Sequence, residues 1–576
     1  MKTKRFVSTL LALLLICGLP VSAFADTWYV DDGNITVNAT ESGQTVTQGA
    51  QVDVPDSAPV ITQSDSSTPT TNTVTITATE NATANVTIQD VNIVISASSE
   101  DTTQYKGQAA VTIDVADGAS ANVTLDGVRI DTENTGGVFI LDTLNPYQTS
   151  GYAAVQITGN GDVTLELDGD NTVQSGFKRA GVEKNTTDDS GNGNLTITDE
   201  NGTDGSLEAT GGISGSGIGG GNAGSGSNIT ISGNAEVTAT GGQHAAGIGG
   251  GINGSGSNIT ITENAEVTAT SILQGAGIGG GINGSGSNII ISDTAKVTAT
   301  GGKYSAGIGG GPDGSGSHIT ISGSAEVTAK GGNAGSGIGG GDGGAGNNIT
   351  ISGSAEVTAK GGNAGSGIGG GLTGTGSNIT VSQNAQVKAQ GGEVYQVDDW
   401  YYGEGAAIGD GGAEQKNAFP DPGAEVDPDI RKLTPNGSIE YYAPGADMET
   451  DAPYKIVTGT YGLSQPAELA QTAPLYRVID QDGKALSCKA ERQDGVLTIT
   501  VDADIASLTG KLGGIQTLKA QGIDTIVFVT NGATSTFALS DLLSQGSTGN
   551  SYTLTHDGST VTFTLNNVTD VSAILQ

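Results

Sequence analysis

An aromatic cluster near residue 400 is the group of residues in this sequence with the clearest chemistry. Only 4% of the 576 residues are Phe, Trp or Tyr, yet four aromatic residues lie close together: Tyr395, Trp400, Tyr401 and Tyr402. Exposed rings of this kind stack against sugars and supply much of the binding energy of interfaces. The cluster is therefore the candidate ligand-binding site. Its alternative role is to plug the open end of a repeat structure.

Charged residues in the first half of the chain form a second candidate. These residues are Asp126, Arg129 and Asp168. Polysaccharide hydrolases use clustered carboxylates, and polysaccharide lyases use a basic residue together with calcium-binding carboxylates. Residues 211–390 contain no Arg and only three Asp residues, so they do not readily build either site. We therefore expect a non-enzymatic protein without catalytic residues. An extracellular polysaccharide lyase or hydrolase is the alternative.

The recurring string GIGGG, or a close equivalent, is glycine-rich in the manner of a phosphate-binding loop. Such a loop occurs once, between a strand and a helix. Here the string occurs six times at intervals of thirty residues, and no helix-forming segment follows any copy. The central residues are Ile218, Ile248, Ile278, Ile308, Ile338 and Ile368. Disordered tracts do not keep such a period, so it predicts stacked repeat units and argues against a nucleotide site.

Within one unit, apolar and polar residues alternate. In NITIS, Ile229 and Ile231 share one face, and in AEVTAT, Val237 lies between two polar neighbours. A third short segment is centred on the Ile of GIGGG. Three short strands per thirty-residue coil, separated by Gly and Asn turns, predict an all-β fold, a parallel β-helix whose coils stack about 4.8 Å apart. One coil cannot fold alone, whereas the stack buries continuous ladders of Ile and Val.

Two further repeat positions predict ladders on the outside of the solenoid. One position is held by Asn228, Asn258, Asn288, His318, Asn348 and Asn378. An Asn there can bridge neighbouring coils or adopt a left-handed conformation. The other position is held by Glu236, Glu266, Lys296, Glu326 and Glu356. We expect this second ladder to be solvated, with cation binding as the alternative.

The chain divides by its patterns into six parts. Residues 1–25 are a signal peptide, 26–70 an N-terminal segment or cap, and 71–210 irregular coils in which a polar-Val-Thr motif starts at Asn85, Asn122 and Asp162. Residues 211–414 are regular coils with the aromatic insertion at 393–405, 415–454 are a Pro/Asp/Gly-rich linker or extended cap, and 455–576 are an α+β or β-rich domain. In the last part, Asp504 could cap a helix that ends at Gly522, DTIVFVT is expected as a buried strand, and a hairpin is expected to turn at Asp557 and Gly558.

The N-terminal residues determine the expected location. Lys2, Lys4 and Arg5 precede an apolar run, and an Ala-Phe-Ala cleavage pattern precedes Asp26, so we expect a secreted, extracellular protein. The chain ends without a sorting motif, so any association with the cell wall is expected to be non-covalent. Cys488 is the one cysteine after the signal peptide, which excludes an intramolecular disulfide from the mature chain.

Charge limits the partners. Loss of the signal peptide removes three positive charges, so the formal net charge of −38 becomes −41. Such a chain is a poor partner for nucleic acid, which proteins bind through Lys and Arg. We expect no membrane insertion, a monomeric rod, and a polysaccharide or host glycan surface as partner. We expect no cofactor, and the Asp-rich irregular coils leave isolated calcium ions open.

Several strings together resemble a known group of proteins. The strings are GNLTITDENGTDGSLEATGG, the repeated AGIGGG, SNITISGSAEVTAKGG, and the closing GIDTIVFVT and STFALSDLLS. Together they are similar to repeat-rich secreted or cell-surface proteins of Gram-positive bacteria. The resemblance implies a right-handed parallel β-helix stalk with an adhesin-like, carbohydrate-binding role. A purely structural component of the envelope is the third hypothesis.

Overall fold

The computed structural model describes residues 26–575 except for 97–107, 136, 139–147, 187–191, 203–204, 417–419, 421, 462–475, 482–483, 485, 487, 494, 521, 547–549 and 567–568. The signal peptide expected at residues 1–25 lies outside the described residues. The chain forms two compact units, Met1–Leu463 and Ser464–Gln576. No helix in the described part is both long and apolar enough to cross a membrane.

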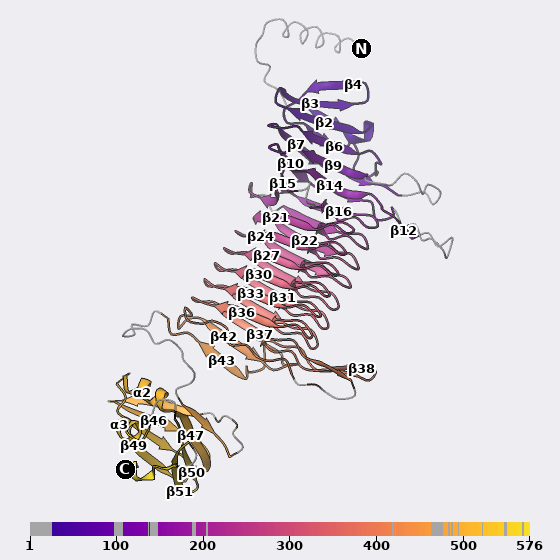
Figure 1. Ribbon diagram of the computed structural model, residues 1–576. Coiled ribbons are helices and arrows are strands. Elements are labelled where there is room, and N and C mark those ends of the chain that lie inside the picture. The colour runs from indigo at the N-terminus through magenta and orange to yellow at the C-terminus, as the bar shows by residue number, and fades with distance from the viewer. Residues whose placement is uncertain are drawn as a thin grey trace. The chain divides into compact units, whose positions relative to one another are not determined.

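The first unit is a parallel β-helix built from three long sheets, which we call A, B and C (Figure 1). In one regular coil, the chain passes through β23 (Ile248–Gly249) in sheet B, β24 (Gly256–Ile261) in sheet A and β25 (Glu266–Ser271) in sheet C. Each strand pairs in parallel with its equivalents in the coils before and after. The all-β fold with three short strands per thirty-residue coil is confirmed.

The remaining regular strands follow the same order. Sheet A contains β21 (Gly226–Gly233), β27 (Gly286–Ile291), β30 (Gly316–Ile321), β33 (Gly346–Ile351) and β36 (Gly376–Val381). Sheet B contains β20 (Ile218–Gly219), β26 (Ile278–Gly279), β29 (Ile308–Gly309), β32 (Ile338–Gly339), β35 (Ile368–Gly369) and β40 (Ile408–Gly409). Sheet C contains β22 (Glu236–Gly241), β28 (Lys296–Thr300), β31 (Glu326–Lys330), β34 (Glu356–Lys360) and β37 (Gln386–Gln390).

The irregular coils feed the same three sheets. Sheet A contains β7 (Thr83–Gln89), β10 (Ser120–Asp126), β15 (Asp162–Asp168) and β18 (Leu195–Asp199). Sheet B contains β6 (Val74–Ala78), β9 (Ala109–Val115), β14 (Ala153–Gly159) and β17 (Val182–Lys184). Sheet C contains β8 (Asn92–Val94), β11 (Arg129–Asp131), β16 (Asp170–Gln174) and β19 (Ser206–Thr210). A short antiparallel pair, β12 (Gly137–Val138) and β13 (Gln148–Thr149), lies beside them.

One register in these coils differs from the sequence prediction. The polar-Val-Thr motifs align Asn122 with Asp162, but β10 and β15 pair Asn122 with Thr164, and Ser120 with Asp162. A shift of two residues leaves every side chain on its original face, so the alternation cannot distinguish the two registers.

Inner ladders of branched side chains form the core. Ile259 stacks between Ile229 and Ile289 in sheet A, and Val267 between Val237 and Val297 in sheet C. These side chains are at most 2% exposed. Each contributes about 1.5–3 kcal/mol through removal of its apolar surface from water, and the inward side chains of all three sheets belong to one core cluster.

Glycine in GIGGG allows neighbouring coils to approach closely. Gly249 has a φ of 128°, and a Cβ atom there would lie 2.1 Å from the carbonyl oxygen of Gly279 in the next coil. Gly279 and Gly309 repeat the arrangement, with a Cβ-to-oxygen distance of 2.0 Å. The repeated glycines are therefore required for stacking, which explains why this motif recurs once in each coil.

The two outer ladders have the predicted registers. The Asn ladder adopts left-handed φ angles of 51° to 56°, and its side chains bond from coil to coil. Asn258 Nδ2 donates to Asn228 Oδ1 at 2.9 Å, and Asn288 Nδ2 donates to Asn258 Oδ1 at 2.7 Å. In the second ladder, Glu266 lies between Glu236 and Lys296, and all three side chains are exposed.

The N-terminal segment already belongs to the solenoid, so the predicted start near residue 71 is too late. Within this segment, β1 (Thr27–Tyr29) pairs in parallel with β5 (Val60–Thr62), and β5 with β7. In sheet B, β2 (Ile35–Thr40) pairs in parallel with β6. Two antiparallel strands, β3 (Gly43–Gln48) and β4 (Gln51–Pro55), then cover the edge of sheet B. A strand edge needs such a cover because its backbone groups are otherwise unpaired.

The segment 415–454, expected as a linker or an extended cap, closes the other end of the stack as a cap would. Its backbone meets sheet B at the Gly409–Glu425 bridge and sheet A at the Thr380–Asp429 bridge. In sheet C, β42 (Ser438–Tyr442) pairs in parallel with β37, and β43 (Lys455–Thr458) pairs antiparallel with β42. Tyr441 is 1% exposed. The boundary between the units therefore falls after Leu463 rather than after residue 454.

The described residues of the second unit form two sheets and two helices. One sheet contains β44 (Arg477–Ile479), β47 (Ile505–Lys511), β50 (Ser551–Asp557), β51 (Thr560–Leu565) and β52 (Thr569–Asp570). The other contains β45 (Lys489–Gln493), β46 (Val496–Thr500), β48 (Thr525–Val529) and β49 (Thr534–Ala538). The helices are α2 (Leu512–Ala520) and α3 (Leu539–Leu543), and 3₁₀ turns occur at Val30–Asp32 in the first unit and Ser572–Ile574 in this one.

The predicted helix from Asp504 to Gly522 is wrong in its first half. Residues 505–511 form β47, which pairs with both β44 and β50, and the helix begins at Leu512. Ala506 and Leu508 are buried as alternate residues of a strand. DTIVFVT forms β48 as expected. The hairpin of β50 and β51 closes with the Asp557–Thr560 pair, one residue later than predicted.

Candidate ligand-binding site

The aromatic insertion forms a hairpin that leaves the last coil. β38 (Tyr395–Val397) and β39 (Trp400–Tyr402) pair antiparallel, and we call residues 395–402 the aromatic hairpin. A third strand, β41 (Glu414–Lys416), pairs with β39. The solenoid is not interrupted, because β40 still pairs with β35 through Ile408 and Ile368. Figure 1 shows β38 extending to one side of the stack, whereas β42 and β43 lie at its end.

The base of the hairpin is anchored to the side of the solenoid. The rings of Tyr395 and Tyr402 stack with centroids 4.4 Å apart and planes 13° from parallel. Both rings pack with Tyr304 against a small buried cluster of Ala334, Ala364 and Leu372, which we call the alanine shelf. Because these residues come from three successive coils, the hairpin is fixed to the regular repeat.

The tip of the hairpin presents its apolar surface to solvent. Trp400 is 41% exposed and Val397 51% exposed, and the two are paired across the hairpin. The ammonium group of Lys416 lies 5.9 Å from the centre of the Trp400 ring, within the range of a cation–π contact. Tyr401 pairs with Gln396 on the opposite face. Of the four predicted residues, Tyr395 and Tyr402 anchor the hairpin, Trp400 is exposed at its tip, and Tyr401 is half-buried.

Acidic groups surround the anchored rings. Burial raises the pKa of Asp342 to about 6, and the negative charges of Asp313 and Glu414 add to the effect. Burial likewise raises the pKa of Tyr395 above its ordinary value, with a smaller contribution from Tyr402. At neutral pH the base of the hairpin therefore combines neutral phenols with carboxylates.

The alternative role of the aromatic residues, as a plug for the end of the solenoid, does not fit this geometry. The ends of all three sheets are covered by backbone from the segment 424–458. The aromatic hairpin instead packs on the side of the coils. Trp400, at the tip of this hairpin, is 41% exposed.

The charged residues of the irregular coils are brought together only in part. Asp126 and Asp168 are neighbours in register on β10 and β15, and the pKa of Asp126 is raised by burial and by the charges of Asp90 and Asp168. Arg129 lies on β11 in sheet C, where its guanidinium is 4.0 Å from Asp131 and mostly exposed. The structure thus provides a carboxylate pair, while the ion-pair partner of Arg129 is Asp131.

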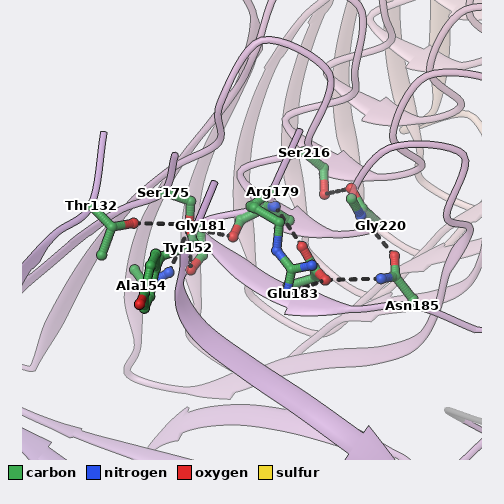
Figure 2. A network of polar contacts seen from close by, with 12 residues as sticks. Thr132, Tyr152, Ala154, Ser175, Arg179, Gly181, Glu183, Asn185, Ser216 and Gly220 are labelled. Carbon is green, nitrogen blue, oxygen red and sulfur yellow. Dashed lines mark hydrogen bonds and ion pairs between the residues drawn. The ribbon is translucent and has the colours of Figure 1, made fainter. Parts of the chain in front are cut away.

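A buried polar network marks the change from irregular to regular coils (Figure 2). Val182 pairs with Ile218, and Glu183 with Gly219, so residues 175–184, SGFKRAGVEK, occupy the place that a GIGGG turn takes in the regular coils. Glu183 lies 3.0 Å from the guanidinium of Arg179 and accepts a 2.9 Å hydrogen bond from Asn185. Burial raises the pKa of Glu183. At 1% exposure, Glu183 cannot reach a ligand in solution.

Tyr304 and Asp342 are the members of the hairpin site that the sequence analysis missed. Tyr304 is the one aromatic residue between 211 and 390, at a repeat position that is Ala in the two following coils. Asp342 replaces the Ile, Pro or Leu of neighbouring coils. Departures from the repeat consensus were therefore the signal that could have identified both residues.

In the part of the chain that the structure describes, no three His, Cys, Asp or Glu side chains are grouped so as to hold a metal ion. His318 stands in the Asn ladder, where Asn348 Nδ2 is 3.4 Å from its Nε2. This contact is consistent with a bend residue, as its repeat position predicts.

Comparison with known proteins supports the architecture. Five segments match the family model described as a beta helix repeat: residues 229–252, 259–282, 289–312, 319–342 and 349–372. Each segment begins at the first inward Ile of a sheet A strand and ends in the turn after GIGGG. Together with the parallel sheets, these matches define a parallel β-helix repeat protein. No curated protein and no solved structure matches the chain significantly.

Proposed function

We propose that this protein is a secreted, non-enzymatic β-solenoid that binds carbohydrate, on a polysaccharide or a glycan-bearing host surface, through the tip of the aromatic hairpin. The observation that carries the proposal is the exposed indole of Trp400 on a hairpin whose base is held by stacked tyrosines. A ring held on a rigid support binds with a lower loss of conformational entropy than a ring on a loose loop. The adhesin-like role at the surface of Gram-positive bacteria rests on the same proposal.

A glycan array probed with the full chain tests this function, followed by calorimetry with the glycans that bind. Trp400→Ala with Tyr401→Ala should weaken binding at least tenfold, a loss of about 1.4 kcal/mol. Tyr29→Ala is the matched control, since Tyr29 is also 41% exposed but lies on β1 in the first coil. An array without binding, or equal affinities of the double variant and the control, would contradict the proposal.

A polysaccharide hydrolase is the second candidate, and the observation that favours it is the Asp126–Asp168 pair. Strands in one sheet lie about 4.8 Å apart, near the carboxylate separation of retaining glycosidases. Incubation with neutral and acidic polysaccharides should release no new reducing ends or unsaturated products if the binding function is correct. Release that Asp126→Asn abolishes would establish the enzyme instead.

Secretion has its own test. Expression of the full chain in a Gram-positive host should yield a medium or wall fraction whose N-terminus is Asp26. Extraction of wall-bound protein by salt would indicate the non-covalent association that we propose. Retention in a covalent wall fraction would favour a purely structural envelope component.

A further inference from the structure

A polar groove crosses the irregular coils, far along the stack from the aromatic hairpin. It has a volume of about 470 Å³ and lies at the turns that lead from sheet B into sheet A. Four successive coils contribute to it, through the connections β6 to β7, β9 to β10 and β14 to β15 and through residues 192–194 before β18. Its lining residues are Asn81, Ala82, Thr83, Asp117, Gly118, Ala119, Ser120, Asn160, Gly161, Asp162, Asn192, Gly193 and Asn194.

The groove has a floor of small residues between two polar rims. The buried floor consists of Ala82, Ala119, Gly161 and Gly193. Larger side chains do not fit there, because a Cβ atom on Gly193 would lie 1.9 Å from the carbonyl oxygen of Gly161. The floor is thus kept low by the same close approach of coils that fixes the glycines of the regular block.

One rim is a continuous ladder of hydrogen-bonding side chains. Thr83, Ser120 and Asp162 are in register on neighbouring strands, and Asn194 continues the row. The hydroxyls of Thr83 and Ser120 are 2.9 Å apart, and Asn194 Nδ2 donates to Asp162 Oδ1 at 2.9 Å. These contacts hold the rim in place while its side chains remain accessible from solvent.

The opposite rim is formed by Asn81, Asp117, Asn160 and Asn192, which precede the floor in each turn. Asp117 and Asn192 are exposed. Amide side chains both donate and accept hydrogen bonds, and hydroxyls do the same. The two rims therefore offer donors and acceptors side by side over three coil spacings, a length of about 14 Å.

Charge and polarity select the ligand. Of the residues that line the groove, none is Lys or Arg, and two are carboxylates, so an acidic glycan would be repelled. None of the lining residues is aromatic or larger than Asn, so the groove lacks the pockets that an apolar peptide needs. The sheet strands beside it already pair with each other, so added peptide backbone finds no free edge.

We propose that this groove is a second binding site, which takes a segment of a linear, uncharged polysaccharide through hydrogen bonds. A chain of hydroxyl-bearing rings, laid parallel to the axis of the solenoid, meets a new set of rim groups at each coil. The site does not depend on the aromatic hairpin, and it extends recognition to a second point on the same solenoid.

Calorimetry with the full chain tests the groove, in a Trp400→Ala/Tyr401→Ala background that removes the hairpin site. The probes are neutral hexasaccharides of glucose, mannose and xylose, with hexagalacturonate as the acidic comparator. We expect at least one neutral hexasaccharide to bind. Adding Asp117→Ala and Asn192→Ala should weaken that binding at least tenfold, because these exposed groups contact the ligand from one rim.

The matched control replaces Glu266 and Thr268 by Ala, two exposed residues on the outer face of β25. It should leave the dissociation constant within twofold, and thermal unfolding should show that both variants are folded. The proposal is overturned if no neutral hexasaccharide binds in the hairpin-deficient background, if the groove variant binds as tightly as the control, or if hexagalacturonate binds more tightly than the neutral probes.

Discussion

Ile248 and Ile278 are thirty residues apart in the sequence, whereas Ile368 and Ile408 are forty apart, yet both pairs occupy neighbouring rungs of sheet B. In the second pair, the additional residues leave the coil as the aromatic hairpin, and the backbone ladder continues past them. The comparison shows that the stack depends on the inward side chains and the glycine turns. A connection between strands can change in length and in residue composition without disturbing the inward side chains or the glycine turns.

The two regions also differ in what surrounds their side chains. In a regular coil, each residue lies between its equivalents in the coils before and after. The same side-chain contacts therefore recur in every regular coil. In the hairpin, Tyr395 and Tyr402 face residues of another type, the alanine shelf and Tyr304. Unique contacts of this kind are needed for a specific binding site, and here they occur where the repeat is broken.

The largest expected effect tests the claim that regular coils depend on glycine. In Gly249→Val, the new side chain meets the carbonyl oxygen of Gly279, so we expect loss of the stacked fold in circular dichroism and thermal unfolding. Gly43→Val is the control, because Gly43 has nearly the same φ, 133°, and nothing within 4 Å of a Cβ. The control should remain folded, with a cost of about 1–3 kcal/mol from backbone strain. Equal effects would show that backbone conformation, rather than coil approach, explains the glycines.

The inward ladder should give the next largest effect. Ile289→Ala removes a fully buried side chain of sheet A and should lower the free energy of unfolding by about 3 kcal/mol, measured by chemical denaturation. Ile290→Ala is the matched control, since Ile290 lies on the outer face between Thr260 and Thr320. It should change stability by less than about 0.5 kcal/mol. A reversed order would contradict the assignment of faces.

The outer Asn ladder should contribute less to the free energy of unfolding than the inward ladder does. Asn258 makes one hydrogen bond to Asn228 and accepts another from Asn288, with a φ of 52°. Asn258→Gly keeps the left-handed backbone and should cost about 1 kcal/mol through lost hydrogen bonds. Asn258→Ala should cost about 1 kcal/mol more, since Ala is strained at this φ. If both variants lower the free energy of unfolding by the same amount, the left-handed backbone conformation does not explain the Asn at this position.

The smallest effect concerns pH at the hairpin. The pKa of Asp342 in the folded protein is about 6, above its ordinary value of 3.8, so the folded state favours the neutral carboxyl. As pH rises from about 4 to about 6, ionisation should weaken the docking of Tyr395 and Tyr402, and above that range the loss should be constant.

Ring signals of labelled tyrosines, followed by NMR, should report this transition, and Asp342→Asn should remove it. Glu356→Gln is the control, because Glu356 is an exposed carboxylate of the outer ladder and should leave the transition in place. A transition of unchanged size in Asp342→Asn would assign the titration to another group.

The sequence predicted the regular coils closely because their signals are local. Period-two alternation assigned Ile229 and Val237 to the core, and the thirty-residue interval placed equivalents on neighbouring rungs. The same alternation could not set the register of β10 on β15, where a shift of two residues keeps the faces. It also could not separate strand from helix at residues 505–511, since Leu508, Leu512 and Ile515 fit a helical spacing until β44 and β50 are present.

The candidate site was found in part. The aromatic residues were evident from composition, but their docking depends on Tyr304, which is 91 residues before Tyr395 in the sequence. No local pattern reports such a contact. The sequence could not decide between a linker and a cap for the closing segment 424–458 for a similar reason, because its Pro, Asp and Gly content fits both while its pairing with three sheet ends is a tertiary property.

The close approach at Gly249 and its equivalents has a consequence for how this gene can change. The coils from β20 to β36 stack through the same inner ladders and glycine contacts, so a whole thirty-residue unit away from Tyr304 and Asp342 can be duplicated or deleted without leaving an unmatched rung. Each such event would move the hairpin by about 4.8 Å relative to the N-terminal cap. Copy number therefore sets the distance between the two ends in fixed increments, while unequal recombination within the repeats would supply the variation.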